Sequence, residues 1–567
     1  MSAVLAPPKP IWTTALPDWG ERILAGRSLT PVGALFPEEA DAAMEVFHSL
    51  RMVDAIVDGV QGPLMGDVCL PWINDFAEAI FGSYDEATNN RLIQEYFLLI
   101  SKKNGKSTDA AAIMLTALIR NRRQSGEFLI LAPTVEIANN SFGPARDMIK
   151  ADDELKDMLR IQENIRTITH LGTGATLKVV AADSDTVGGK KAIGVLVDEL
   201  WLFGKQPNAE NMLREATGGL VSRPEGFTIF LSTQSDQAPA GVFKQKLNYA
   251  RDVRDGKIDD PKFLPCLYEF PPEILEVNGH RDPSLFYVTN PNLGLSVSQD
   301  WLDREFAKAE NAGEDSMCGF LAKHLNVEIG VNIRSNNWAG APYWKQCEVV
   351  EVTLDYLIKN SEVVVAGADG GGLDDLLGFC LIGRERKTRR WLIWCYAWAH
   401  SIVLERRKNE AARLLDLQEA KCLKIVDTPG QDVQELAEIV ARVFKAGKLH
   451  QIGVDPSGIG GIIDAIVEAG VPEKDNVMGV QQGWKLTGAI KTVERKLVAK
   501  EISHAPQPLM DWCVGNAKSE VKGSNLYITK QVSGSGKIDP LLALFNAASI
   551  MLLNPPSKEK QYQMRVF

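Results

Sequence analysis

The chain of 567 residues has no paired metal-binding cysteines or histidines and no long apolar run. Its eight cysteines form no Cys-x-x-Cys pair and its seven histidines no His-x-His or His-x-x-x-His group, so we expect no structural zinc site. No apolar stretch approaches the roughly 18 residues of a membrane span. The Pro-rich start, residues 1–10, lacks the continuous apolar stretch of a signal peptide. We therefore expect a cytoplasmic protein in a reducing compartment, without a membrane partner.

Positive charge is also in deficit, since the formal net charge is -11 at pH 7. This balance argues weakly against a protein coated in nucleic acid, although local patches rather than the total charge set phosphate contacts. Basic residues cluster at 120–123, 384–390 and 406–408. A solvated face or turn is the first interpretation of each cluster.

The order of predicted elements indicates more than one domain, as the length requires. Residues 1–35 are expected to be irregular. From about residue 95, short apolar strands alternate with amphipathic helices, the pattern of a mostly parallel sheet covered by helices. Residues 338–343 are expected to be a connecting stretch. Strands at 363–368, 377–383 and 391–398 predict a meander, and the alternating elements that follow suit a ribonuclease H-like domain.

A phosphate-binding loop is predicted after the first strand of the parallel sheet. The residues are Lys103-Asn104-Gly105-Lys106-Ser107-Thr108, and they match the end of the pattern Gly-x-x-x-x-Gly-Lys-[Ser/Thr], with Ile100 in place of the first Gly. Loop amides and a helix N-terminus can cradle phosphates. Lys106 would neutralise the outer phosphates, and the Ser107 hydroxyl would bind Mg²⁺.

Two further strand ends carry polar residues that suit nucleotide hydrolysis. Asp198 and Glu199 end a buried strand; Asp198 would hold the metal and Glu199 would polarise the attacking water. Ser232, Thr233 and Gln234 end another strand, where they could sense the γ-phosphate. The alternatives are a helix cap for the two acids and a simple turn for the triplet.

Three aspartates in the last third of the chain predict a metal-dependent nuclease. Asp369 and Asp455 end apolar strands, and Asp539 opens an apolar helix. Buried acids are costly unless a cation receives them, and two-metal phosphodiester cleavage needs converging carboxylates. Asp374 and Asp375 follow Asp369, and one of them is a further candidate ligand. The alternative for Asp539 is an N-cap, since Asp before Pro is an ordinary helix start.

Together these segments resemble the large subunit of tailed-bacteriophage terminases, motors that package and cut DNA. The resemblance runs from about residue 70 to 552, and the missing first Gly of the phosphate loop is usual in that family. It is carried by the phosphate loop, Leu196-Val197-Asp198-Glu199, Ser232-Thr233-Gln234, Asn290-Pro291-Asn292-Leu293-Gly294, Gly367-Ala368-Asp369, Val454-Asp455-Pro456 and Lys537-Ile538-Asp539-Pro540.

The expected fold class is α/β, with a P-loop ATPase domain containing a mostly parallel sheet, followed by a ribonuclease H-like α/β nuclease domain. The expected division is an N-terminal segment at 1–60, the ATPase core at 61–255, an ATPase-associated or linker region at 256–350, and the nuclease domain at 351–567.

The resemblance also implies cofactors and partners. The cofactors are ATP with Mg²⁺ and two Mg²⁺ or Mn²⁺ ions at the nuclease site. The partners are double-stranded DNA, a small terminase subunit and a portal ring, in the cytoplasm of a host cell. A ring of identical copies is implied during packaging, with a monomer in solution as an option.

Three points stay open at this stage. An arginine that reaches a neighbour's ATP is expected just before the Asp-Glu strand, but Lys190 and Lys191 stand there, and Arg223 is an alternative. A helicase or repair ATPase with an appended nuclease is a second function. An assembly adaptor with inactive sites is a third.

Overall fold

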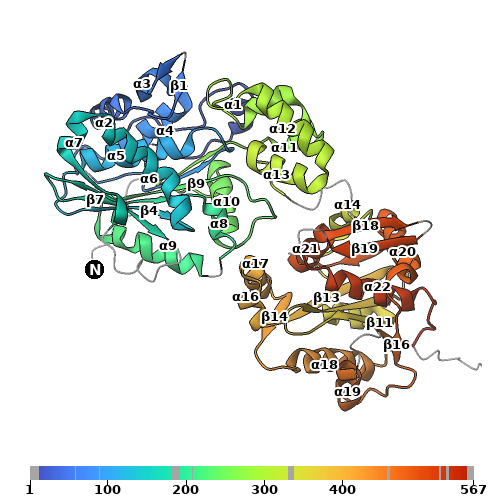
Figure 1. The fold of residues 1–567 in the computed structure, drawn as a ribbon. Helices are drawn as coiled ribbons and strands as arrows, with labels where there is room; N and C mark the ends of the chain where they lie inside the picture. The colour runs from blue at the N-terminus through green and yellow to red at the C-terminus, as the bar shows by residue number, and fades with distance from the viewer. Residues whose placement is uncertain are drawn as a thin grey trace, which may run out of the picture. The chain divides into compact units, whose positions relative to one another are not determined.

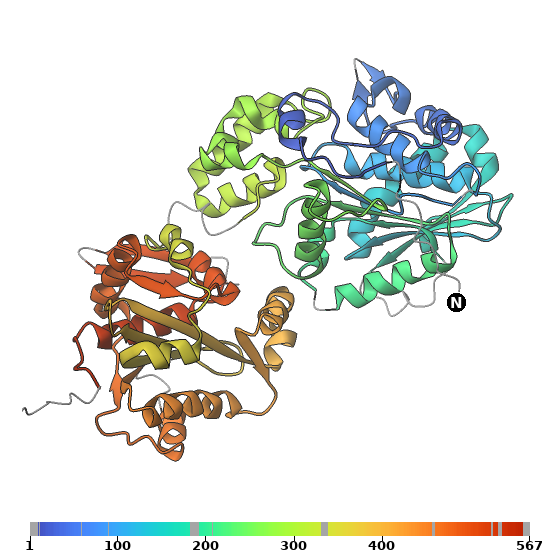
Figure 2. The ribbon, with the colours of Figure 1, turned by 180° about the vertical axis from the view of Figure 1, so that it is seen from behind.

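The computed structural model divides into two compact units, Met1–Ile329 and Gly330–Phe567. It describes residues 10, 12–57, 59–88, 90–181, 192–206, 208–329, 338–455, 460–522, 525–530 and 536–558. Each unit has a central sheet with helices packed on it (Figures 1 and 2).

The first unit contains an eight-stranded sheet whose central strands are parallel. Only the last two pairings, β7 with β6 and β6 with β5, are antiparallel. In spatial order the strands are β10 (Phe263–Leu267), β3 (Glu95–Leu99), β9 (Phe227–Ser232), β8 (Ala192–Val197), β4 (Glu127–Ala132), β7 (Thr176–Ala181), β6 (Thr167–His170) and β5 (Leu159–Gln162). The strand that ends in the polar triplet, β9, therefore lies between the strands that carry the phosphate loop and the two acids.

Helices cover both faces of this sheet, which explains the uninterrupted burial of β8 and β9. Figure 1 shows α5 and α6 on one face and α9 on the other. The helices are α1 (Trp19–Leu24), α2 (Pro37–Ser49), α3 (Met65–Val68), α4 (Pro71–Phe81), α5 (Lys106–Arg120), α6 (Val135–Lys150), α7 (Asp153–Met158), α8 (Leu200–Phe203), α9 (Ala209–Gly218), α10 (Gly241–Arg254), α11 (Pro272–Glu276), α12 (Gln299–Ala312) and α13 (Glu314–Leu325).

The second unit has a seven-stranded sheet built on an antiparallel meander. The strands are β14 (Leu423–Val426), β13 (Trp391–His400), β12 (Leu376–Glu385), β11 (Ser361–Gly370), β15 (Leu449–Val454) and β16 (Val477–Gly479), with β17 (Ile502–His504) paired to β13. β15 runs parallel to β11, so the carboxyl ends of these two strands lie side by side at the same end of the sheet. A separate hairpin joins β18 (Ala517–Lys522) and β19 (Asn525–Lys530).

Two hydrophobic clusters on opposite faces make this sheet the middle of three layers. Along β11, Val364, Ala366 and Ala368 belong to the cluster that includes α18, whereas Val365 belongs to the cluster that includes α22. The helices are α14 (Ala341–Trp344), α15 (Leu354–Asn360), α16 (Ile402–Arg406), α17 (Lys408–Glu419), α18 (Gln431–Lys445), α19 (Gly460–Glu468), α20 (Thr487–Val498), α21 (Pro508–Asn516) and α22 (Asp539–Met551).

The structure confirms the α/β class, the mostly parallel first sheet and the meander of the second. It corrects two local expectations. Residues 1–35 contain the short helix α1, and the segment 338–343 is part of a core rather than a plain connection. Trp338 is fully buried against Phe545 of α22, with ring centroids 5.4 Å apart. Composition alone did not show this, because a lone Trp among Gly, Ala and Pro has no periodic pattern.

The division of the chain into segments stays a prediction, but the packing bears on one of them. β10 lies within the expected linker region and is an edge strand of the first sheet, and α12 and α13 pack in the same unit. In the part of the chain that the structure describes, no helix has the length and apolar character of a membrane span.

Two glycines let α22 approach the second sheet more closely than any side chain would allow. A Cβ at Gly367 would collide with the carbonyl oxygen of Ala543, and one at Gly378 with the backbone of Asp539. α22 is therefore seated on the backbone of β11 and β12, and the start of the helix is fixed along with it.

Gly367→Ala is expected to destabilise the second unit by about 3 kcal/mol, because the backbone of α22 cannot retreat without opening the core. Hydrogen exchange of peptides from β11 and β12 measures the change. The matched control is Gly461→Ala on α19, where an added Cβ meets no atom within 4 Å. Equal exchange in both variants would contradict a tight seat for α22.

Candidate functional site

The loop between β3 and α5 is held in shape by asparagine side chains. Gly105 caps α5 with φ +78°, a conformation that favours glycine. Asn104 is fully buried and donates from Nδ2 to Asn290 Oδ1 at 2.8 Å. Its Oδ1 accepts from the backbone N–H of Asn292 at 3.0 Å, and Asn292 Nδ2 donates to Asn104 O at 3.0 Å. We call Asn104, Asn290 and Asn292 the asparagine clamp. Trp72 Nε1 on α4 donates to Asn292 Oδ1 at 2.7 Å, so the clamp is also bonded to an N-terminal helix.

The loop lysine is paired with one of the two strand-end acids. Lys106 is 8% exposed, and its Nζ lies 2.5 Å from Glu199 Oε1. Glu199 Oε2 accepts from Trp201 Nε1 at 2.6 Å. Burial opposes ionisation of Glu199, but Lys106 and Trp201 outweigh it and lower its pKa. Lys106 and Glu199 are thus a charged pair inside the edge of the sheet.

Asp198 is the other acid that follows β8, and one of its carboxylate oxygens has no hydrogen-bond donor. It is fully buried, and Ser141 Oγ donates to its Oδ2 at 2.9 Å. Its Oδ1 is buried without a hydrogen-bond partner. Burial raises the pKa of Asp198 to about 6, with Glu199 adding to the shift and Lys106 opposing it. A buried carboxylate oxygen without a donor suits a cation ligand.

Neither acid caps a helix by a side-chain bond. Glu199 stands at the N-cap position of α8 with φ +52°, but its side chain makes no capping bond there. The helix-cap alternative for Asp198 and Glu199 therefore does not account for their side-chain contacts.

The triplet at the end of β9 lies beside the loop and the acids. All three residues are fully buried. The Ile100 N–H donates to Ser232 O at 3.0 Å, and Ser232 Oγ accepts from the N–H of Trp201 at 3.0 Å. Gln234 O accepts from Lys323 Nζ at 2.7 Å. The triplet thus contacts Ile100 after β3, Trp201 on α8 and Lys323 on α13, which an isolated turn would not do.

Lys323 on α13 is a site residue that the sequence pattern did not reveal. Its Nζ lies 2.9 Å from the centroid of the Trp201 ring, and its carbonyl oxygen accepts from the N–H of Lys102 at 2.8 Å. Burial lowers the pKa of Lys323 to about 7, although Asp236 and Glu199 oppose the shift. No motif marks this lysine, because its contacts join segments far apart in sequence.

The remaining predicted residues of this site are less constrained. Lys103 is exposed, whereas Ser107 and Thr108 are half-buried in the first turn of α5. Lys190 and Lys191 lie outside the described residues. Arg223 precedes β9, so it lies at the opposite edge of the sheet from the triplet.

In the second unit, strand pairing brings the predicted acids together. Ala368 on β11 pairs with Val454 on β15, so Asp369 and Asp455 follow paired residues. Asp369 is 8% exposed. Burial, and then repulsion from Asp539 and Asp455, raise the pKa of Asp369 to about 8.

Asp539, at the start of α22, lies near enough to Asp369 to raise its pKa, but it is not the N-cap of α22. That position belongs to Ile538, and no side chain caps the helix. Asp539 is 3% exposed, and its Oδ2 is buried without a hydrogen-bond partner. Burial and Asp375 raise its pKa to about 6, against the pull of Lys530, whose Nζ lies 3.6 Å from Oδ1. The structure thus contradicts the capping alternative.

Of the two acids that follow Asp369, only Asp375 lies with Asp539. Its Oδ1 accepts from Lys537 Nζ at 2.7 Å and its Oδ2 from Lys530 Nζ at 3.2 Å. Burial opposes ionisation of Asp375, but these lysines outweigh it and lower its pKa. Asp374 instead pairs with Arg407 at 3.3 Å, on the surface.

Glu410 on α17 is a third buried acid in this neighbourhood, beside Asp369 and Asp539, and was not predicted. It is 5% exposed, and its Oε2 has no hydrogen-bond partner. Burial raises its pKa to about 7, while Lys537 and Arg407 oppose the shift. His504, by contrast, is buried in β17 and stacks on Trp344 with centroids 4.0 Å apart, so it belongs to the core.

The charge of Asp369, Asp455 and Asp539 and the unpartnered oxygen of Asp539 suit divalent cations. The side chains are not arranged as a coordination sphere in this structure. Within the described ranges, no three His, Cys, Asp or Glu side chains are placed to hold a metal ion. Asp539 Oδ2 has no hydrogen-bond partner, and the pKa of Asp369 is raised by burial and then by the charges of Asp539 and Asp455, so neither carboxylate is fully compensated.

Comparison with known proteins also divides the chain into two parts. The family model "Terminase large subunit, ATPase domain" matches residues 71–252, and "Terminase large subunit, endonuclease domain" matches residues 257–553. The second match begins inside the first structural unit, which extends to Ile329 and includes β10, α12 and α13.

Three relatives illustrate the range of similarity. The terminase large subunit of Lactococcus phage SK1 is 22% identical over 85% of this chain and 87% of its own length. Protein YmfN of Escherichia coli (strain K12) is 24% identical over 53% of this chain and 66% of its own. The crystal structure of the HK97 bacteriophage large terminase aligns with a TM-score of 0.47 at 20% identity, covering 90% of this chain and 99% of that one.

Asn104→Ala is expected to loosen the loop, because it removes the acceptor for the Asn292 N–H and the donor to Asn290. Hydrogen exchange of peptides spanning residues 100–108 should speed up at least about tenfold, corresponding to about 1.4 kcal/mol of local stability. The control Asn311→Ala changes an exposed asparagine on α12 and should leave the loop unchanged. If residues 100–108 exchange as in the unaltered protein, the asparagine clamp does not set the shape of the loop.

Proposed function

The chain belongs to the terminase large subunits, with the ATPase and endonuclease domains of that family, and from this premise we propose how its residues perform the two reactions. The protein is an ATP-driven DNA-packaging motor and a DNA endonuclease, hence a hydrolase of ATP and of DNA. A helicase or repair ATPase is not favoured. The assignment of residues below rests on the contacts described above.

We propose that residues 103–108 bind the phosphates of ATP. The supporting observation is the Lys106–Glu199 pair, 2.5 Å apart, which links the phosphate loop directly to the acidic strand. Lys106 would neutralise the outer phosphates, while the Ser107 hydroxyl and the unpartnered Oδ1 of Asp198 would hold the Mg²⁺ of the nucleotide. When ATP binds, the ammonium of Lys106 exchanges the carboxylate of Glu199 for phosphate oxygens.

Glu199 is then the base for hydrolysis. Released from Lys106, its Oε1 can accept a proton from water as the water oxygen bonds to the γ-phosphorus and ADP departs. Trp201 Nε1 keeps the other oxygen of Glu199 in place. In the nucleotide-free pair, Lys106 masks the base, so water activation requires a bound nucleotide.

The triplet Ser232, Thr233 and Gln234 would couple the nucleotide state to movement. Gln234 O is bonded to Lys323, which also covers Trp201, the partner of Glu199. A change at Glu199 can therefore reach Lys323 on α13 through the Trp201 ring, and the carbonyl of Gln234 is bonded to the same lysine. These contacts support the coupling role expected for Gln234, and Thr233 is bonded to it through Oγ1 at 3.4 Å from Gln234 O.

Glu199→Gln should retain ATP binding and lose turnover by at least about 100-fold, because the amide keeps the shape of the side chain but cannot accept the proton. ATPase rates and binding of a fluorescent ATP analogue measure the two properties. The control is Glu210→Gln on the exposed face of α9. Turnover at the unaltered rate in Glu199→Gln would remove Glu199 from the mechanism.

In the second unit, we propose that Asp369, Asp455 and Asp539 hold two divalent cations, Mg²⁺ or Mn²⁺, with Asp375 as an additional ligand. Such ions, when bound, activate water and stabilise the leaving oxygen in phosphodiester cleavage. The support is the convergence of these acids at the shared edge of β11, β15 and α22. Lys530 and Lys537 would balance the charge between cutting events, and Glu410 would add negative charge beside Lys537.

Asp539→Asn should lower endonuclease activity more than about 100-fold, because the amide removes the charge of a metal ligand. Plasmid linearisation in Mn²⁺ measures it, and ATPase activity should persist, since the two sites lie in different units. The matched control is Asp374→Asn, whose carboxylate pairs with Arg407 outside the cluster. If Asp539→Asn cuts as well as Asp374→Asn, Asp539 is not a ligand.

We further propose the partners that packaging requires. These are double-stranded DNA, a small terminase subunit and a portal ring, with several copies of this chain forming a ring during packaging in the cytoplasm of the host. Membership of the family supports these partners.

A further inference from the structure

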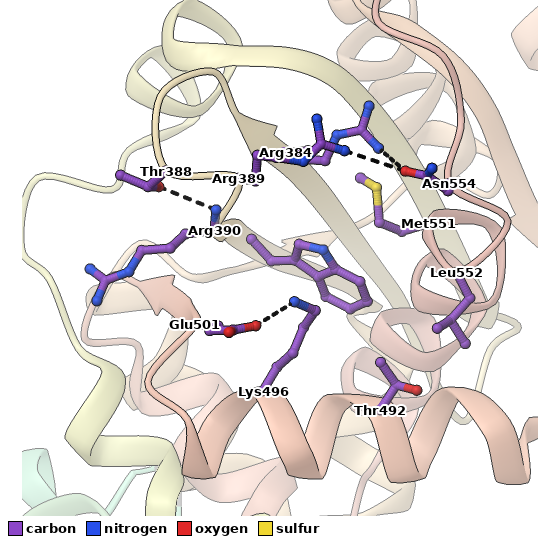
Figure 3. Close-up of a pocket in the computed structure, with 11 residues that line it drawn as sticks. Arg384, Thr388, Arg389, Arg390, Thr492, Lys496, Glu501, Met551, Leu552 and Asn554 are labelled. Atoms are coloured by element: carbon purple, nitrogen blue, oxygen red, sulfur yellow. Dashed lines mark hydrogen bonds and ion pairs between the residues drawn. The ribbon is translucent and has the colours of Figure 1, made fainter.

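A basic pocket lies in the second unit, outside the carboxylate cluster. It is a cavity of about 400 Å³ at the turn between β12 and β13, closed by α20 and by the end of α22 (Figure 3). Its charged lining consists of Arg384, Arg389, Arg390, Lys496 and Glu501. Four cationic side chains thus face one carboxylate, in a chain whose net charge is -11.

The pocket is at the other end of the sheet from the predicted cutting site. Asp369 pairs with Gly378, whereas Arg384 pairs with Trp391, and both pairings involve β12. Gly378 and Arg384 are separated by six positions, or about 20 Å at ~3.3 Å per residue. The basic side chains therefore do not contribute to the charge balance of the carboxylates.

Some of these cations have structural partners. Arg384 is 6% exposed and bonds to Glu362, to Asn554 Oδ1 at 2.7 Å and to Pro555 O at 2.8 Å, which ties the end of the chain to β12. Lys496 pairs with Glu501 at 2.8 Å. These contacts build the wall of the pocket.

Two arginines on the rim are available to a ligand. Arg389 has a side chain 59% exposed, and it contacts Glu362 at 3.2 Å and Asn554 at 3.4 Å. Arg390 is exposed, and its guanidinium has no hydrogen bond or ion pair with a described residue; only its backbone N–H is bonded, to Thr388 Oγ1 at 3.2 Å. Figure 3 shows the Arg390 side chain pointing away from Arg384 and Arg389.

Further exposed cations lie beyond the rim, on the turn between β12 and β13 and on or just after α20. The exposed cations are Lys387 on the turn, Lys491 and Arg495 on α20, and Lys500 just after it. A single carboxylate would need one or two of these groups. A surface of this extent instead suits a polyanion with closely spaced charges, and arginine forks match phosphate oxygens.

We propose that this basic pocket and its rim bind backbone phosphates of duplex DNA, as a second DNA contact about 20 Å from the cutting edge. The inference rests on the proposed function, because DNA is the substrate of that edge. The contact carries no sequence information, since it reaches phosphates only. It holds the duplex beside the nuclease unit whether or not the carboxylates are engaged.

The test compares the full-length protein with the double variant Arg389→Gln/Arg390→Gln. Binding to a 40-base-pair duplex is measured in EDTA over a range of salt concentrations, so that no cutting occurs. The variant should bind at least about tenfold more weakly at 0.1 M salt, and the slope of log K against log salt should fall by about 2, or roughly 0.9 per lost phosphate contact.

The control Lys445→Gln/Lys474→Gln removes the same charge from exposed positions elsewhere in this unit. It should bind DNA as the unaltered protein does. ATPase activity equal in all three proteins shows that the substitutions leave the first unit intact, and unchanged hydrogen exchange of β12 and β13 shows the same for the second.

An affinity and salt slope equal to those of the unaltered protein would overturn the proposal and leave this surface for an acidic protein segment. An equal loss in the control would also overturn it, because the effect would then be general charge. If the unaltered protein neither binds nor cuts DNA, the proposed function itself fails, which is a different result.

Discussion

The burial of charged groups at strand ends is the constraint on which both sites depend. Lys106 and Asp198 are buried beside the half-buried Glu199 in the first unit, and Asp369 and Asp539 are buried in the second. Ionised groups in such positions are stable only when each has a partner of opposite charge or a full set of hydrogen bonds. In the first unit a lysine meets one acid; in the second, two lysines stand beside a group of acids that still repel one another. The proposed nucleotide and metal ions would supply the charge that these two groups of side chains lack.

The two sites use parallel pairing in different ways. In the first unit, β9 between β3 and β8 places the triplet against both the phosphate loop and the acids, so three segments distant in sequence share one edge. In the second, only β11 and β15 run parallel in the relevant place, and α22 provides the third acid. The first arrangement links parts that must respond to each other. The second places Asp369, Asp455 and Asp539, the proposed metal ligands, close to one another.

Sequence reasoning identified the strands and acids because local patterns mark them. Buried strands such as β8 and β11 are continuous apolar runs, and a charged residue at the end of such a run is conspicuous. It did not identify Lys323, Glu410 or the clamp on Asn104, since each depends on contacts between segments far apart in the chain. Trp338 was misplaced for the same reason: its environment is made by α22, some 200 residues later. The individual roles of the acids remain predictions of chemistry rather than of pattern.

Gly378 on β12 contacts both elements that carry the predicted nuclease acids Asp369 and Asp539. It pairs across the sheet with Asp369, and its missing side chain receives the backbone of Asp539. One residue thus sets the position of two acids from opposite directions. A slip of β12 by a single position would turn the next side chain toward α22, expel the helix and separate the acids at once. The same glycine therefore disfavours a misaligned β12, because a side chain at this position would meet the backbone of Asp539 and Pro540.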